Sequence, residues 1–155
     1  MKPFPQPMRP GIRLKSLSSA PKEGWIWQPK FNDERAMMSP DGRVFNRHGD
    51  LFCPKKLAQF RFRPCGEWVD LLLLGFRTGG PRTVVEIDYP YREGVYFQRV
   101  RNAGAHLLCF TDPLECWGTF HGRPGIEGIV GRKADAPYCF GDSDNMIAIR
   151  WKGAR

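Results

Sequence analysis

One lysine near the start of the chain has neighbours that could make its amine a nucleophile. Lys30 stands directly after a proline, and an arginine follows at Arg35. An amine attacks phosphorus only in its neutral form, so its pKa must be lowered by burial or by nearby positive charge. The apolar residues that could bury the amine are Trp27, Pro29 and Phe31, and the cations that could supply charge are Arg35, Arg132, Arg150 and Lys152. Taken alone, such a lysine is more often a solvated side chain on a strand.

The charge of the chain favours a negatively charged partner. The sequence has 24 Lys+Arg against 16 Asp+Glu, which gives a net charge of +8 and a pI of about 9.5. Such a field attracts polyanions, so nucleic acid or a nucleotide is the expected partner. The alternative is that the charge serves only solubility.

With 155 residues, 41% of them hydrophobic and 13% aromatic, the chain is long and apolar enough for one folded domain.

Several classes of protein are disfavoured by simple counts. The five cysteines are widely spaced and include no C-x-x-C pair, which argues against a disulfide framework and against a zinc site. No apolar stretch has the length of a signal peptide core or of a membrane span. We therefore expect a reduced, cytoplasmic protein without a membrane partner.

The elements that must position these residues can be read from prolines, turns and apolar spacing. Residues 1–23 are rich in proline and are expected to form an extended arm that packs on a body spanning 24–155. Apolar alternation predicts strands at 25–39, 44–52, 67–77, 82–90, 125–133 and 145–155. Helical spacing predicts a short helix at 54–62 and a longer one at 96–110. Turns at "PDGR" and "TGGP" join four of the strands into two hairpins, which indicates an α+β domain with mainly antiparallel pairing.

Six short segments, in this order, resemble the nucleotidyltransferase motifs of ATP-dependent DNA and RNA ligases. They are "KFNDER" at 30–35, "NRHGD" at 46–50, "EWVDLLLLGFR" at 67–77, "EIDYP" at 86–90, "EGIVGRK" at 127–133 and "IRWK" at 149–152. The resemblance covers Trp25 to Lys152 and is strongest in "EGIV" with the basic strand that follows. It implies the ligase adenylation fold, an ATP-grasp-like arrangement of two antiparallel sheets with flanking helices and a nucleotide cleft between the sheets.

The resemblance also implies roles for individual residues. Lys30 would be the catalytic residue that becomes adenylylated. The nucleotide-binding residues would be Gln28, Arg35, Arg47, Glu127, Arg132, Arg150 and Lys152, and the metal ligands would be Glu127 and Asp70. The implied cofactors are ATP and Mg²⁺.

The sequence departs from the family pattern at several of these positions. Asn32 and Asp33 stand where the family has aspartate and glycine, and Arg132 replaces a lysine. Leu72 stands where a glutamate is expected, with Glu67 as an alternative for that acid. The second, oligonucleotide-binding (OB) type of domain that usually follows in ligases is not expected in 24–155.

Two functions are consistent with this pattern. One is an ATP-dependent ligase-like nucleotidyltransferase that forms a lysyl-AMP intermediate and transfers AMP to a 5′-phosphate of nicked or 5′-phosphorylated DNA or RNA, as in DNA repair. A separate partner domain could then close the site. The other is a catalytically impaired relative that binds nucleotide or nucleic acid in the same cleft. Lys30, Arg35 and Glu127 favour the first function, whereas Leu72 and the Asn32–Asp33 pair favour the second.

Overall fold

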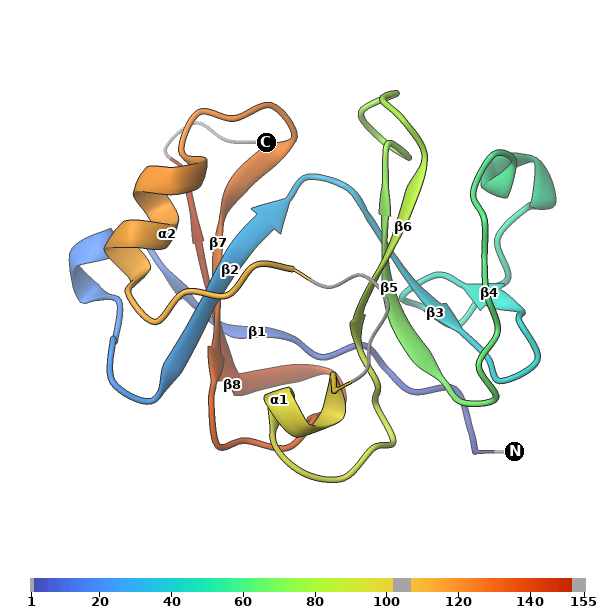
Figure 1. The fold of residues 1–155 in the computed structure, drawn as a ribbon, viewed down its shortest axis with the longest axis horizontal. Coiled ribbons are helices and arrows are strands. Elements are labelled where there is room, and N and C mark those ends of the chain that lie inside the picture. Colours follow the sequence, from blue (N-terminus) through green and yellow to red (C-terminus); the bar gives the residue numbers. More distant parts are fainter. Residues whose placement is uncertain (1, 102–106, 152–155) are drawn as a thin grey trace.

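Two four-stranded sheets form the body of the protein (Figure 1). The computed structural model describes residues 2–101 and 107–151. Sheet A has the strand order β1 (Arg9–Leu14), β8 (Asp142–Arg150), β7 (Ile126–Lys133) and β2 (Trp25–Phe31). Sheet B has the order β4 (Val44–Phe45), β3 (Glu34–Met38), β5 (Val69–Leu74) and β6 (Thr83–Asp88). The chain passes from sheet A to sheet B between two consecutive strands, β2 and β3.

The long strand predicted at 25–39 is divided between the two sheets. It breaks at Asn32 and Asp33, so that β2 pairs with β7 in sheet A and β3 pairs with β5 in sheet B. The backbone N–H of Asn32 donates to the carbonyl of Gly125 at 2.8 Å, which holds the crossing against the start of β7. The chain therefore passes from one sheet to the other directly after Lys30.

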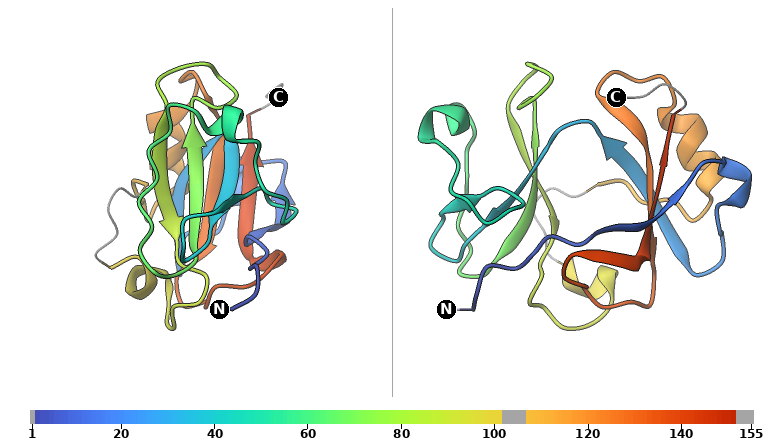
Figure 2. Two further views of the ribbon diagram at one scale, coloured as in Figure 1. Left: turned by 90° about the vertical axis from the view of Figure 1, so that its right-hand side faces the viewer. Right: turned by 180° about the vertical axis from the view of Figure 1, so that it is seen from behind.

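The N-terminal arm contributes a strand, which the sequence reading did not predict. β1 pairs with β8 in parallel, so sheet A is mixed rather than purely antiparallel. Ahead of β1, Phe4 packs against Phe45 and Trp68 beside sheet B. Figure 2 shows the segment running across both sheets (right view). The arm thus ties the two sheets together from one side.

The helix prediction at 96–110 is wrong over most of the described part. Helix α1 ends after one turn (Tyr96–Arg99), and Phe110 instead pairs with Trp27 as an extended bridge. Residues 102–106 lie outside the described residues. The longer helix is α2 (Pro113–Phe120), where the Asp112 side chain caps the first turn by accepting from the Leu114 N–H at 2.9 Å. This helix was not predicted from the sequence, although an aspartate followed by proline is a known signal for a helix start.

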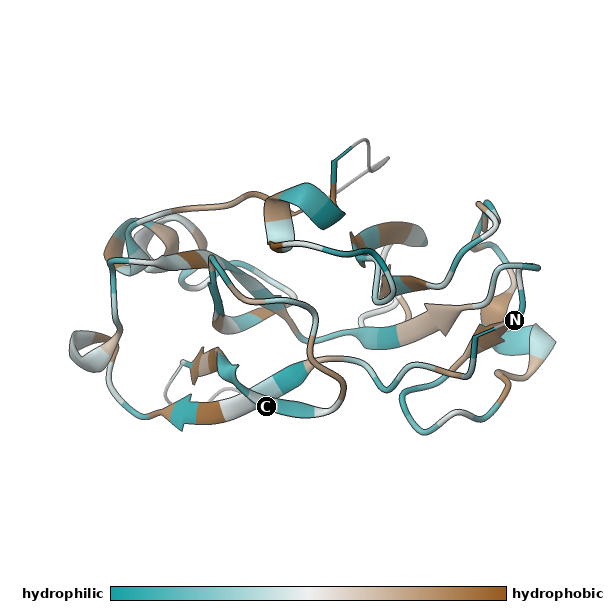
Figure 3. Ribbon diagram, turned by 90° about the horizontal axis from the view of Figure 1, so that it is seen from below, coloured by the Kyte–Doolittle hydropathy of each residue, from teal (hydrophilic) through white to brown (hydrophobic). Residues whose placement is uncertain are grey.

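Apolar clusters cover the outer face of each sheet. On sheet A, Cys116 and Phe120 of α2 are buried with Trp27 and Ile129. On sheet B, Leu71 and Leu73 share a cluster with aromatic residues from the loop that follows β4. Figure 3 shows apolar residues recurring along the strands of both sheets. The inner faces are consequently left to line the space between the sheets.

The loop after β4 contains less regular structure than the sequence predicted. β4 has only two residues, and the helix expected at 54–62 is a 3-10 turn, η2 (Pro54–Leu57); a second such turn, η1 (Leu17–Ser19), follows β1. Phe60 and Phe62 lie beyond η2 and pack under the loop. The apolar spacing at 54–62 therefore reflected burial and not helical structure. Among the described residues, no helix has the length and apolar character needed to cross a bilayer.

Candidate functional site

A cavity of about 400 Å³ lies between the two sheets and gathers most of the residues singled out in the sequence. Its walls include Gln28, Lys30, Arg35, Arg47, Leu72, Glu127, Arg132 and Arg150. Strands β2, β7 and β8 of sheet A supply five of these residues, and β3 and β5 of sheet B supply two. Strand pairing across each sheet is what brings these distant motifs to one place.

At this cavity, Lys30 forms an ion pair with Glu127. The Lys30 Nζ lies 2.6 Å from Glu127 Oε1, and Arg150 Nη2 lies 3.2 Å from Glu127 Oε2. The Lys30 side chain is 23% exposed, Glu127 11% and Arg150 43%. We call these three residues the mouth triad. Because they remain partly open to solvent, a negatively charged ligand can reach both cations.

A shift in strand register directs Glu127 toward Lys30. In the β2–β7 pair, Lys30 lies opposite Gly128 but Phe31 lies opposite Ile126, so Glu127 is the extra residue of a bulge. Without the bulge, strict alternation would point Glu127 away from the face that carries Lys30. Gly128 lies so close to β8 that a Cβ there would be 2.0 Å from the Ile149 carbonyl oxygen. The bulge and the glycine together bring the carboxylate between its two cations.

Gln28 and Arg132 lie deeper and belong to a buried network centred on Asp88. Arg132 Nε donates to Gln28 Oε1 at 2.9 Å, and Arg132 Nη1 lies 3.2 Å from Asp88 Oδ2. Arg99 binds the same carboxylate with two bonds of 2.9 Å. The Gln28 amide nitrogen donates to the Tyr96 hydroxyl at 2.8 Å. Both the oxygen and the nitrogen of the Gln28 amide are thus hydrogen-bonded within the protein. Burial raises the pKa of Tyr96 to about 12.

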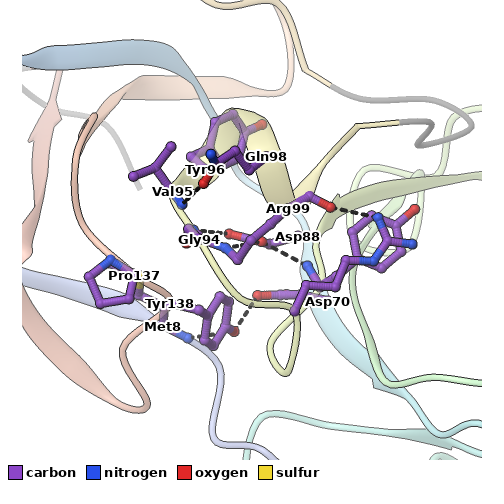
Figure 4. A network of polar contacts seen from close by, with 12 residues as sticks. Met8, Asp70, Asp88, Gly94, Val95, Tyr96, Gln98, Arg99, Pro137 and Tyr138 are labelled. Atoms are coloured by element: carbon purple, nitrogen blue, oxygen red, sulfur yellow. Dashed lines mark hydrogen bonds and ion pairs between the residues drawn. The ribbon is translucent and has the colours of Figure 1, made fainter.

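Arg35 lines the cavity with a side chain that is 21% exposed, and it pairs with Asp70, which is fully buried behind it. Arg35 donates from Nε at 2.7 Å and from Nη2 at 2.5 Å to the two oxygens of Asp70. Tyr138 also donates to Asp70, at 2.6 Å, and its own hydroxyl accepts from the Met8 backbone N–H at 2.8 Å (Figure 4). Burial lowers the pKa of Arg35, but the charge and hydrogen bonds of Asp70 outweigh it and raise that pKa above its ordinary value. Asp70 is fully buried, so this carboxylate lies in a structural contact and not at the open surface of the cavity.

The residues that depart from the family pattern have identifiable local roles. Asp33 accepts from the Gly75 N–H at 2.7 Å and from the Arg77 N–H at 2.9 Å, which anchors the turn between β5 and β6. Leu72 lines the cavity and is buried with Val85 and Ile87. The position expected to carry a glutamate therefore forms part of an apolar wall.

Three further cations reach the cavity that the sequence reading did not assign to it. Arg9 and Arg13 come from β1, and Arg77 comes from the β5–β6 turn. Their positions depend on the parallel pairing of β1 and on the Asp33 anchor, which had no local signal in the sequence. Of the residues that were assigned, Lys152 lies outside the described residues. The apolar residue Trp27 points to the opposite face, against α2, so it does not bury the Lys30 amine.

The donor set of the cavity restricts how Mg²⁺ could bind. The described residues contain no group of three or more His, Cys, Asp or Glu side chains able to hold a metal ion. Asp70 does not fit as a ligand, because it is fully buried and is not among the residues that line the cavity, whereas Glu127 is. Glu127 does fit, because Mg²⁺ is often bound by one or two carboxylates together with substrate phosphates.

Comparison with solved structures shows the fold. No family model matches the sequence, and no curated protein matches it. The ligase domain of LigD from M. tuberculosis has a TM-score of 0.67 at 14% identity, covering 94% of this chain and 59% of that one. Chlorella virus DNA ligase-adenylate has a TM-score of 0.65 at 16% identity, covering 96% and 67%. A Lig E DNA ligase has a TM-score of 0.61 at 14% identity, covering 91% and 68%.

These likenesses confirm the predicted fold. The chain has the α+β fold of DNA ligase adenylation domains, in a small and divergent form. It spans 59% to 68% of the length of these solved chains.

Proposed function

We propose that the protein is a ligase-like nucleotidyltransferase that uses ATP to form a lysyl-AMP intermediate at Lys30 and passes the AMP to a nucleic acid. The observation that carries this proposal is the mouth triad, in which an amine lies 2.6 Å from a carboxylate at the wall of a cation-lined cavity. The ligase fold supports the same reading, and one of the similar structures, a mycobacterial DNA ligase D, is described as complexed with ATP.

The chemistry follows from the groups present. The Lys30 Nζ attacks the α-phosphorus of ATP, a P–N bond forms, and the P–O bond to the β-phosphate breaks so that pyrophosphate leaves. Glu127 is the nearest group that can accept the proton of the amine. The cations of the cavity stabilise the negative charge on the phosphates during this transfer. Mg²⁺ bound to the phosphates, with Glu127 as its protein ligand, would add further charge compensation.

The second half of the reaction returns Lys30 to its starting state. A phosphate oxygen at the 5′ end of a nucleic acid attacks the phosphorus of lysyl-AMP, and the P–N bond breaks as Lys30 regains a proton. A 3′-hydroxyl then displaces AMP and joins the strands. The proposed substrate is therefore nicked or 5′-phosphorylated DNA or RNA. We propose that the protein acts in the cytoplasm, in nucleic-acid repair. We also propose that a partner domain closes the site.

Recognition of the base is expected to be weak. Reading adenine through Gln28 would require its amide to leave Tyr96 and Arg132. The apolar wall formed by Phe31, Leu72, Ile87 and Leu107 can hold any base by contact. The charge of the cavity is better suited to the phosphates than to the base.

A second candidate function is a catalytically impaired relative that binds nucleotide or nucleic acid in the same cavity. It is favoured by the engagement of Arg35 with Asp70 and by the apolar side chain at Leu72. In this case the cavity would bind phosphate groups without forming a covalent bond to Lys30.

Covalent labelling separates the two functions. The protein is incubated with ATP labelled at the α-phosphate and with Mg²⁺, and label that survives denaturing electrophoresis is measured. We expect labelling of the native protein and none of Lys30→Ala, while the matched variant Lys133→Ala, at an exposed position on β7, is labelled normally. Label that persists in Lys30→Ala, or that maps to Lys133 or Lys152 by mass spectrometry, would contradict the assignment. Binding of ATP without labelling would identify the impaired relative.

A further inference from the structure

Six cations form a surface outside the cavity, which we call the basic face. Lys55, Lys56, Arg61 and Arg63 come from the loop after β4, and Arg77 and Arg82 come from the β5–β6 turn. The first segment has no acidic residue over 51–66, and the second has none over 71–85. Figures 1 and 2 show η2 and the tip of the β5–β6 hairpin at the same end of sheet B. Two parts of the sequence therefore combine into one positive surface.

Four of the six cations of this surface are unlike the arginines of the cavity and the buried networks, whereas Arg77 is paired with Glu34 at 2.9 Å. Arg35, Arg92, Arg99, Arg132 and Arg150 each form an ion pair with a carboxylate. Lys55, Lys56, Arg61 and Arg63 are exposed, and none of them has an ion pair with any other residue that the structure describes. Their charge is therefore available to an external anion, at no cost in broken internal contacts.

Aromatic packing holds the two segments together. The Phe60 and Phe76 rings are 6.3 Å apart, the Phe52 and Phe76 rings are 5.6 Å apart, and the guanidinium of Arg82 lies over Phe60 at 5.8 Å. Two hollows of about 380 and 390 Å³ result. The first is lined by Lys55, Lys56, Phe76 and Arg82, and the second by Arg61, Phe62 and Arg63 together with apolar residues and one carboxylate, Glu86. Each hollow places a partly exposed phenylalanine beside cations. Cations that follow a backbone and aromatic rings that contact bases are the combination used for binding nucleic-acid strands.

The basic face is connected to the cavity by the β5–β6 turn. Arg77 of this turn lines the cavity, and Arg82 of the same turn lines the first hollow. Asp33, at the crossing that follows Lys30, accepts two backbone hydrogen bonds from this turn. A strand that lies on the basic face is thus led by positive charge toward Lys30.

We propose that the basic face binds the phosphate backbone of the nucleic acid whose 5′-phosphate enters the cavity, an inference that rests on the proposed function for the identity of the partner. Nucleic acid fits this surface better than an anionic membrane does, because the apolar rings lie in hollows and do not protrude. The contact is electrostatic, so binding should weaken steeply with salt as counterions are released.

The test compares two variants that remove the same charge from different surfaces. The basic-face variant is Lys55→Gln, Lys56→Gln, Arg61→Gln and Arg63→Gln. The control variant is Lys15→Gln, Arg101→Gln, Arg123→Gln and Lys133→Gln, all at exposed positions away from this surface. Binding of a fluorescent 5′-phosphorylated single strand and of a nicked duplex is measured by anisotropy across a salt series, and melting temperatures confirm folding.

We expect the basic-face variant to lose on the order of 100-fold in affinity at low salt, with the log-log salt slope reduced by about three to four, because each lost phosphate contact reduces the slope by about one. The control variant should keep the native slope to within about one. Equal losses in both variants, an unchanged slope in the first, or binding of the native protein to anionic vesicles but to neither oligonucleotide would overturn the proposal. Labelling of Lys30 by ATP is measured on the same samples. A native protein that is not labelled but binds nucleic acid through the basic face would contradict the proposed function and leave this inference standing.

Discussion

The mouth triad and the buried network centred on Asp88 contain similar groups in different surroundings. In each of them a carboxylate binds two basic side chains, Glu127 with Lys30 and Arg150, and Asp88 with Arg99 and Arg132. The Asp88 side chain is fully buried and its two arginines are at most 4% exposed, whereas Arg150 is 43% exposed. The difference lies in solvent access and not in the kind of residue.

This difference decides which cations can exchange their partner for a ligand. Removing one member of a buried ion pair leaves an uncompensated charge and typically costs about 3 to 5 kcal/mol, whereas an exposed pair contributes about 1 kcal/mol or less. A phosphate can therefore replace Glu127 beside Arg150 at small cost. It can replace Asp88 beside Arg132 only by disrupting the network that holds the two sheets.

The largest expected effect comes from the buried carboxylate. Asp88→Asn leaves two buried arginines without a counter-charge, and we expect the free energy of unfolding to fall by about 3 to 5 kcal/mol. Urea denaturation measures it. The matched change in the other region, Glu127→Gln, should cost under about 1.5 kcal/mol because its partners reach solvent. Similar losses in the two variants would show that the regions do not differ as described.

Substitution of one arginine from each region should separate an effect on activity from an effect on stability. Arg150→Gln is expected to slow labelling of Lys30 on the order of 10- to 100-fold, since one charge-assisted contact is worth about 1.5 to 3 kcal/mol. Its stability should change by less than about 1 kcal/mol. Arg132→Gln should instead lower stability by several kcal/mol. Labelling kinetics and melting curves on both variants check the contrast, which fails if Arg150→Gln destabilises the protein as much as Arg132→Gln does.

Leu72 tests whether the apolar wall can accept the carboxylate expected from the ligase pattern. Leu72 is buried with Val85 and Ile87, so Leu72→Glu should lower the free energy of unfolding by about 1 to 3 kcal/mol. The control Leu72→Met should cost less than about 1.5 kcal/mol. Labelling should be no faster than in the native protein. An increase of tenfold or more would mean that the wall can form the acidic contact and that its absence limits the rate.

The smallest expected effect concerns alkaline pH. The pKa of Tyr96 is raised from 10.0 to about 12, chiefly by burial. Between these values the unfolded tyrosine loses its proton while the folded one keeps it, so the unfolded state binds fewer protons and stability falls as pH rises. The stabilising contribution is complete below pH 10 and should decline by roughly 1 to 2 kcal/mol across the window. Tyr96→Phe should melt with a shallower dependence on pH between 10 and 11.5, and an identical slope would argue against burial as the cause.

The sequence by itself determined much of the fold, because strand alternation and turn residues act locally. The hairpin of β5 and β6 lies within its predicted bounds, and β7 follows "EGIVGRK" closely. Ordered motifs also predicted a shared cleft, and the structure places Gln28, Lys30 and Glu127 on one cavity. These features follow from residue type and spacing, which are present in the chain before it folds.

Only the tertiary structure decided which of these side chains are engaged with other residues. Gln28 meets Arg132 across 104 residues of sequence, and Tyr138 meets Asp70 across 68, and no local pattern encodes such pairs. The bulge that turns Glu127 toward Lys30 arises from how β7 registers with β2. The break of the first long strand at Asn32–Asp33 depends on the second sheet being there to receive β3. Hydrogen bonding and burial are properties of residues brought together by folding. A motif can therefore predict that an arginine belongs to the site, but it does not show whether that arginine is available to a ligand.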